Sequence, residues 1–268
     1  MKLENQRILL TGAGGGIGSQ VARLLAAQGA RLALLDLSPA ALQETIDAIG
    51  ASRHQPLAVP VDLMDNAQRE AAVTQAISQL GGIDMLINNA GMMSFRPFSE
   101  EDPAVIERIV RLNTLVPMLL TRQLLPQLLS QGSGRIVNVG STFGSIAFAW
   151  FATYSTSKFG LRGFSEALRR ELADSGVGVT YVAPRAVRTK LNSSAIYRMA
   201  ERIKMNMDEP EWVAGKIVES IINGRKDVYL GFPESFFVRL NALLPRLVDG
   251  AMKKQNHIMM AFAKEGRS

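Results

Sequence analysis

The sequence predicts an α/β protein built on a doubly wound parallel sheet of about seven strands in three layers. Short apolar segments alternate with longer amphipathic segments from the N-terminus onward. Two of the short segments, 32–35 (LALL) and 85–87 (MLI), are apolar at every position. Strands buried on both faces, as in a parallel sheet covered by helices, have this composition. The repeated strand–helix alternation therefore favours an α/β fold.

Each strand is predicted from a short apolar run, and each helix from apolar residues at three- and four-residue spacing. The predicted strands are residues 7–11, 31–35, 56–61, 83–88, 134–139, 178–182 and 227–231. The predicted helices are residues 17–28, 39–49, 66–79, 102–130, 154–174 and 211–223. In the fourth helix, Pro117 has no N–H to donate to the carbonyl of Asn113, so we expect a kink there.

The chain is predicted to form one domain, because no Pro/Gly/Ser-rich linker or internal repeat divides it. Residues 1–231 form the main part, and residues 232–268 form a C-terminal extension of the same domain. Within 236–252, apolar residues recur at helical spacing around Pro245. We expect two short amphipathic helices, with Pro245 opening the second.

Composition excludes several classes of protein. With 268 residues, of which 47% are hydrophobic and 20% charged, the chain is not disordered. It has no cysteine, which excludes disulfides, thiolate metal sites and a cysteine nucleophile. Its two histidines, His54 and His257, lie far apart in the sequence, so we expect no metal site.

The net charge of +6 arises entirely after Pro184, where basic residues are scattered among apolar ones. This pattern indicates solvated helix faces, so we expect no nucleic-acid partner. No apolar run of ~18 residues is present, and the N-terminus does not resemble a signal peptide. We expect a cytoplasmic protein, with peripheral contact at a membrane surface as an alternative.

A glycine-rich loop follows the first predicted strand. It contains Gly12, Gly14, Gly16, Ile17 and Gly18, and a helix begins within it. Glycines allow close approach of a ligand, and a helix N-terminus favours a pyrophosphate. At the end of the next strand, 18 residues beyond Gly18, stands Asp36. A carboxylate at this offset binds a ribose 2′-hydroxyl and repels a 2′-phosphate, so the pattern favours NAD over NADP.

Three further motifs occur in order: Asn88-Asn89-Ala90-Gly91 after the fourth strand, Ser141 after the fifth, and Tyr154-x-x-x-Lys158 thirteen residues beyond Ser141. Together with the glycine loop, they resemble the short-chain dehydrogenase/reductase family over roughly the first 230 residues. The resemblance implies a Rossmann-like fold and an oxidoreductase that transfers a hydride between NAD(H) and a secondary alcohol or ketone.

The chemistry of Ser141, Tyr154 and Lys158, which we call the catalytic set, supports the same function independently of the resemblance. Tyr154 and Lys158 lie one helical turn apart, on the same face. A free tyrosine, with a pKa of about 10, is a poor base at neutral pH, and a nearby ammonium should lower that pKa. Ser141 can then orient the substrate oxygen while Tyr154 acts as acid/base.

The resemblance implies further roles with less direct support from the residues. Asn113 corresponds to the family's asparagine that holds a water in a proton relay from the lysine. The remaining positions implied to contact the cofactor are Asp62, Asn88, Ala90, Gly91, Tyr154, Lys158, Pro184, Val187 and Thr189. Arg185 stands where the family usually has glycine, which leaves open whether its side chain enters the substrate space.

Large apolar residues flank the catalytic pair, and a lid is implied after Thr189. These residues are Phe143, Ile146, Phe148, Trp150, Phe151, Met199, Met205 and Met207. They favour a lipophilic small-molecule substrate, although the same pattern also suits an ordinary core. The family analogy and the mixed apolar faces of 102–130 predict a homo-oligomer, a dimer or a tetramer.

Two alternatives to the oxidoreductase remain open: a non-catalytic cofactor-binding regulator or scaffold, and epimerase or dehydratase chemistry on the same fold. Two readings of the C-terminal helices also remain open. They either pack on the domain or a partner subunit, or lie on a membrane, where Arg239, Arg246, Lys253, Lys254 and Lys264 would meet anionic headgroups.

Overall fold

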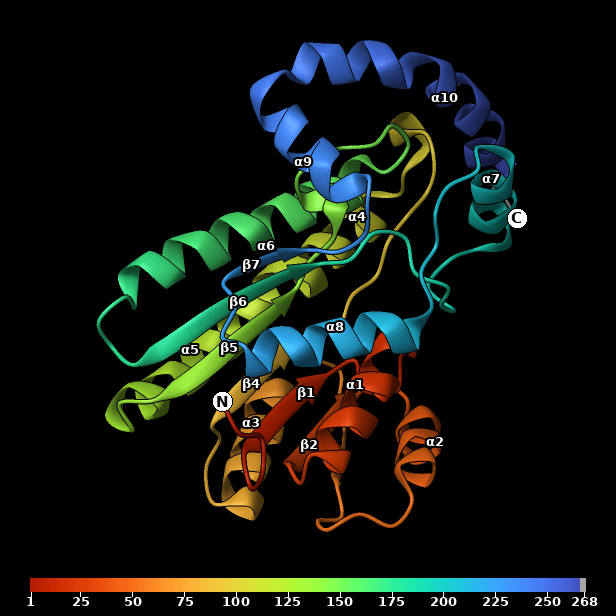
Figure 1. The fold of residues 1–268 in the computed structure, drawn as a ribbon. Coiled ribbons are helices and arrows are strands. Elements are labelled where there is room, and N and C mark those ends of the chain that lie inside the picture. Colours follow the sequence, from red (N-terminus) through yellow and green to blue (C-terminus); the bar gives the residue numbers. More distant parts are fainter. Residues whose placement is uncertain (266–268) are drawn as a thin grey trace.

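The structure, a computed structural model, describes residues 1–265 apart from the side chain of Lys254. Across these residues a seven-stranded sheet runs in the order β3-β2-β1-β4-β5-β6-β7, and all of its neighbouring strands are parallel. Helices cover both faces (Figure 1). The predicted doubly wound, three-layer fold is confirmed. The order reverses between β1 and β4, where such sheets place their ligands.

The strands lie close to their predicted positions. They are β1 (Arg7–Thr11), β2 (Arg31–Asp36), β3 (Leu57–Pro60), β4 (Met85–Asn88), β5 (Gly134–Val139), β6 (Val177–Ala183) and β7 (Asp227–Tyr229). In the centre of the sheet, Leu9 pairs with Ala33 on one side and with Leu86 on the other. All three are fully buried, as their uninterrupted apolar strands predict.

The helices of the main part divide into two layers. They are α1 (Gly16–Ala27), α2 (Pro39–Ile49), α3 (Asn66–Leu80), α4 (Pro103–Val110), α5 (Val116–Ser130), α6 (Ala152–Glu171), α7 (Ser194–Arg202) and α8 (Pro210–Ile222). One core cluster lies beneath α1, α2 and α8, and two others lie beneath α3, α5 and α6 (Figure 1). The carboxyl ends of the strands are thereby held as one rigid edge.

The helix predicted over 102–130 is interrupted in the region where the kink is expected. A π-helical turn, Arg111–Leu115, separates α4 from α5. Pro117 opens the first turn of α5, so the missing N–H falls within this irregular stretch. The turn brings Asn113, which is fully buried, to the carboxyl edge of the sheet.

The region implied as a lid after Thr189 contains a helix, α7, that periodicity alone did not reveal. Ser193 caps it by accepting a hydrogen bond from Ile196 N at 3.3 Å. Its apolar face, which includes Met199, is buried. The segment is therefore folded against the molecule, although the helix is short.

The C-terminal extension forms α9 (Glu234–Leu243) and α10 (Pro245–Glu265). Pro245 opens α10 as predicted, but α10 has 21 residues and is not short. The two helices arch over the carboxyl edge of the sheet, and α10 meets α7 (Figure 1). Within residues 1–265, no helix is long and apolar enough to cross a membrane.

Candidate active site

The glycine loop packs so tightly that side chains would not fit. Gly12 has a left-handed φ of +65°, and a Cβ there would lie 2.8 Å from Ala90 Cα. A Cβ on Gly18, in the first turn of α1, would lie 2.0 Å from the Gly12 carbonyl oxygen. Both distances are shorter than any real contact, so these positions require glycine. Without side chains, the loop backbone can be approached closely by a ligand at the N-terminus of α1.

Asn89 joins the glycine loop to the Asn-Asn-Ala-Gly motif. Its side-chain amide donates to the carbonyls of Thr11 and Gly12, at 3.1 Å each. The Thr11 hydroxyl in turn accepts from the backbone amides of Asn89, at 3.0 Å, and Ala90, at 3.1 Å. The two motifs thus form one hydrogen-bonded unit across β1 and β4. Sequence reasoning quoted Asn89 within its motif but assigned it no role.

Asp36 lies at the end of β2 and holds the loop from the other side. Its carboxylate oxygens accept from Gly14 N at 2.9 Å and from Ser38 N at 3.1 Å. Each oxygen keeps capacity for a further donor, such as a ribose hydroxyl. Asp36 therefore has a structural role in addition to the predicted one.

A groove of about 1010 Å³ runs along this edge of the sheet. Of the predicted cofactor residues, it is lined by Gly12, Gly14, Gly16, Ile17, Asp36, Asp62, Ala90, Gly91 and Thr189. Its glycine cradle, its helix N-terminus and the carboxylates of Asp36 and Asp62 fit a dinucleotide. Among the described residues, no three His, Cys, Asp or Glu side chains gather as metal ligands would.

The other predicted cofactor residues lie outside the lining of this groove: Gly18, Asn88, Tyr154, Lys158, Pro184 and Val187. Asn88 is buried in the sheet, where its amide donates to Asn138 Oδ1 at 2.8 Å. The Val187 carbonyl already accepts from Asn192 Nδ2 at 2.6 Å. The Pro184 carbonyl accepts from the backbone amide of residue 142 at 2.9 Å, which ties its loop to the segment after β5.

Ser141, Tyr154 and Lys158 come together at the carboxyl edge. Ser141 follows β5, caps a short 3₁₀ turn by accepting from Phe143 N at 3.1 Å, and hydrogen-bonds Tyr154. Tyr154 lies in the first turn of α6. One turn later, Lys158 places Nζ 5.8 Å from the centroid of the Tyr154 ring and donates to Val139 O at 3.1 Å.

The expected lowering of the Tyr154 pKa by Lys158 is wrong for this structure. Burial raises the pKa of Tyr154, and the hydrogen bond with Ser141 offsets only part of the rise. Burial also lowers the pKa of Lys158 to about 8. The ammonium lies over the ring and bonds a backbone carbonyl, so desolvation outweighs its attraction for the phenolate. The Tyr154 hydroxyl therefore keeps its proton more firmly than a free tyrosine does.

Asn113 holds the loop after β4 beside Lys158. Its side chain accepts from Met92 N at 2.9 Å and donates to Met92 O at 2.8 Å. It also donates to Ser157 Oγ on α6 at 2.9 Å. A Cβ on Gly91 would lie 3.2 Å from Asn113 Oδ1 and 3.7 Å from Lys158 Nζ. Asn113 thus joins the cofactor groove to the catalytic helix.

Arg185, the departure from the family pattern, does not point freely into the substrate space. It pairs with both oxygens of Asp208, at 2.9 and 2.7 Å, and with Glu234 at 2.9 Å. It also donates to the Phe232 carbonyl at 3.1 Å. A Cβ on Gly231 would lie 2.6 Å from the Arg185 side chain, so glycine there makes room for it.

An apolar cluster surrounds Tyr154. Its buried members are Phe95, Phe151, Ile196, Met199, Met259 and Ala263. Phe143, Phe148, Trp150 and Met205 pack against them, as does Tyr154 itself. Among the predicted substrate-side residues, Ile146 belongs instead to a cluster with Val238 and Val248. Met259 and Ala263 come from α10, which agrees with the alternative in which the C-terminal helices pack on the domain.

Fold and site together define a nicotinamide-dependent oxidoreductase of the short-chain type. The chain belongs to the short-chain dehydrogenase/reductase family: the family profile described as "short chain dehydrogenase" matches residues 6–199. Members of this family bind NAD(P) and act on CH–OH groups of small molecules.

Two relatives cover most of the chain. A ketoacyl reductase, HetN, from Nostoc sp. is 36% identical over 226 residues, which are 84% of this chain and 78% of HetN. The dehydrogenase/reductase SDR family member 7B from Bos taurus is 31% identical over 258 residues, 91% of this chain and 79% of that protein.

Solved structures show the same fold. A short-chain dehydrogenase/reductase from Burkholderia phymatum, in complex with NAD, aligns with a TM-score of 0.83 and 23% identity over 92% of this chain and 96% of its own. Levodione reductase aligns with a TM-score of 0.77 and 26% identity over 85% of this chain and 96% of its own.

Proposed function

We propose that this protein transfers a hydride between NAD(H) and a lipophilic secondary alcohol or ketone, with Tyr154 as acid/base. The observation that carries the proposal is the juxtaposition of three side chains. Ser141 hydrogen-bonds Tyr154, and Lys158 lies over the Tyr154 ring one helical turn away. A regulator or scaffold without turnover would have no need of this arrangement.

Each side chain has a separate task in ketone reduction. A nicotinamide cofactor held in the groove would supply the hydride chemistry. The neutral Tyr154 hydroxyl donates its proton to the carbonyl oxygen, and the Ser141 hydroxyl orients that oxygen by a hydrogen bond. Lys158 provides positive charge beside the phenolate that forms. Alcohol oxidation is the reverse: it starts from the Tyr154 phenolate, which accepts the proton of the alcohol.

Asp36 supports NADH as the preferred cofactor. Its carboxylate lines the groove and is fixed by Gly14 N and Ser38 N. A 2′-phosphate would bring negative charge against it. The loop from Gly12 to Gly18 contains no lysine or arginine that would compensate.

The apolar cluster around Tyr154 supports a lipophilic substrate. Ring pairs such as Phe143–Phe148 and Phe95–Phe151 stack at centroid distances of 4.5 and 4.6 Å. The names of two similar proteins, a ketoacyl reductase and levodione reductase, refer to reduction. We therefore favour ketones that carry an acyl chain or an apolar ring.

A homo-oligomer is proposed from exposed apolar residues on adjacent elements. Val110 ends α4, Leu115 ends the π-turn, and Met118 lies in α5; all three are exposed. Phe159 on α6 is 40% exposed, and a Cβ on its neighbour Gly160 would lie only 3.0 Å from the side chain of residue 114 in the π-turn. A second copy that covers this face would remove these side chains from water.

A substrate screen tests the proposed function. Purified protein is incubated with NADH and a panel of acyl, steroid-like and aromatic ketones, and the loss of NADH absorbance is followed. We expect turnover on apolar ketones and formation of the matching alcohol. Epimerised or dehydrated product without net loss of NADH would replace the proposal by chemistry that recycles the cofactor. Cofactor binding without any product would favour the regulatory alternative.

A further inference from the structure

The outer face of the C-terminal helices is apolar and exposed. The residues on it, which we call the α9–α10 patch, are Phe232, Phe236, Phe237, Leu243, Leu244 and Leu247. Their exposed fractions range from 42% for Phe237 to 79% for Phe232 and Leu243. Monomeric proteins seldom leave so many large apolar side chains together in water.

The patch is not a by-product of a loosely attached segment. On the opposite side of the same helices, Val238 and Val248 are buried against Ile146. Asn241 Nδ2 donates to the carbonyl of residue 145 at 2.9 Å, and Trp150 Nε1 donates to the carbonyl of residue 256 at 3.1 Å. The helices are thus anchored through one face, as the packing alternative predicts, while the other face has no cover among the described residues.

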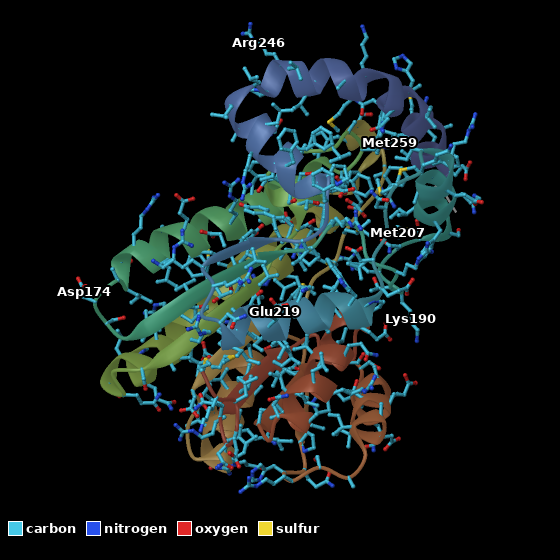
Figure 2. The ribbon with its side chains drawn as sticks, in the orientation of Figure 1. Asp174, Lys190, Met207, Glu219, Arg246 and Met259 are labelled. Carbon is cyan, nitrogen blue, oxygen red and sulfur yellow. The ribbon has the colours of Figure 1, made fainter. Side chains whose placement is uncertain are left out.

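Positive charge accompanies the patch. Arg239 and Arg246 are exposed beside it, and Arg246 projects away from the body of the molecule at the outer side of the arch (Figure 2). Two acids of the segment are engaged elsewhere, since Glu234 pairs with Arg185 and Glu265 with Arg198. Asp249 is the remaining acid of 234–265. Basic residues therefore outnumber acidic ones on the outer surface of these helices, and the electrostatic potential there is positive.

We propose that the α9–α10 patch docks this protein on an anionic lipid surface. The leucine and phenylalanine side chains enter the boundary between headgroups and acyl chains, and Arg239 and Arg246 meet the lipid phosphates. The contact is peripheral, since none of the described helices can cross a bilayer. Symmetric docking of a second copy would instead set arginines against arginines.

Docking would connect the lipid surface with the cluster around Tyr154 through one helix. The N-terminal end of α10 carries Leu247 of the patch, and its C-terminal part contributes Met259 and Ala263 to the cluster that contains Tyr154. A lipophilic ketone taken from the surface layer would therefore approach Tyr154 along α10. This consequence rests on the proposed function, whereas the docking itself does not.

Vesicle sedimentation of the full chain tests the docking. Vesicles of phosphatidylcholine alone are compared with vesicles that also contain phosphatidylglycerol, at low and high salt. We expect binding to the anionic vesicles that weakens in high salt. Leu243→Ser/Leu247→Ser should weaken it at least about tenfold through lost apolar burial. Arg246→Glu should weaken it about fivefold or more.

Matched controls lie on α5, away from the patch. Leu129→Ser changes another exposed leucine and Arg122→Glu another exposed arginine, and both should bind like the unchanged protein. Circular dichroism checks that each variant is folded, and Arg246→Glu serves if the leucine pair does not fold. Unchanged binding of the patch variants would overturn the proposal. So would a lower molecular mass of these variants by light scattering, because a second copy would then cover the patch in the unchanged protein. None of these measurements requires turnover by the protein, so their outcome is independent of the proposed function.

Discussion

The hydroxyl of Tyr181 lies against the backbone of Ser141. It donates to the Ser141 carbonyl at 3.2 Å and accepts from the Ser141 amide at 3.4 Å. A Cβ on Gly140 would lie 2.2 Å from the Tyr181 ring, so the chain before Ser141 passes directly over it. Tyr181 is fully buried on β6, and burial raises its pKa well above the usual value. It is a neutral support that positions the backbone of Ser141.

Tyr181→Phe should therefore slow the reaction without blocking cofactor binding. The ring still fills its site, but both contacts to Ser141 are lost, which at about 1 kcal/mol corresponds to a roughly fivefold lower kcat. Steady-state kinetics measure the effect, with KM for the ketone and the affinity for NADH nearly unchanged. A kcat equal to that of the unchanged protein would show that Ser141 does not need this support.

Tyr154→Phe should abolish measurable turnover and leave NADH binding nearly intact. The variant removes the group that exchanges the proton, which lowers kcat by a factor of about 10² to 10⁴. The matched control is Tyr229→Phe, whose hydroxyl lies 3.4 Å from Ser145 Oγ and outside the catalytic set. Turnover and fluorescence titration with NADH are measured on both. Normal turnover by Tyr154→Phe would exclude the proposed mechanism.

Burial of Lys158 should make the cofactor-free protein more stable as the pH rises from about 7 to about 9. The pKa of Lys158 is about 8 in the folded chain and 10.5 as its ordinary value, so in this range the unfolded chain binds more protons. Stability then increases with pH, by about 1 kcal/mol between these two values. Urea unfolding at both pH values, compared with Lys158→Met, isolates the contribution. An equal slope in the variant would contradict it.

Asp36→Ala should narrow the difference between NADH and NADPH affinities. The unchanged protein is expected to bind NADH more tightly, and removal of the carboxylate should reduce the preference at least about tenfold. Affinity for NADH should also fall, because Gly14 N and Ser38 N lose their acceptor. Asp62→Ala provides the comparison. Both NADH and NADPH contain the adenine ring that Asp62 is proposed to contact, so this variant should lower both affinities equally. Tighter NADPH binding by the unchanged protein would refute the assignment.

Phe159→Glu should shift the protein toward smaller assemblies. A charge on the exposed α6 face would be costly to bury between two copies. Light scattering at micromolar concentration measures the mass, and Leu129→Glu, at a position 43% exposed near the end of α5, is the control. If the unchanged protein is already a monomer, the proposed oligomer is wrong.

The fold could be predicted from the sequence because its strands and helices each have a local pattern of apolar residues. The apolar strands came within a few residues of their observed bounds, and the doubly wound order followed from their alternation with helices. The resemblance to the short-chain dehydrogenase/reductase family implied that Ser141, Tyr154 and Lys158 lie together. Helical spacing then placed Lys158 one turn beyond Tyr154.

Other parts depended on contacts that no local pattern contains. In a strand buried on both faces, alternation does not tell which of Asn88 and Asn89 faces the groove. Tyr181 and Ser141 are forty residues apart. The direction of the Tyr154 pKa shift depends on burial, which arises from residues of several distant segments around the ring. The interruption at Arg111–Leu115, by contrast, could be anticipated from Pro117.

Arg185 links two segments that border the cleft: Asp208, just before α8, and Glu234, at the start of α9. Neither segment can swing outward alone without breaking part of this partly buried ion-pair set. Displacement of either segment would therefore have to break part of the Arg185 ion-pair set, so the start of α9 and the approach to α8 are held in one arrangement. High ionic strength should weaken this link between the two segments.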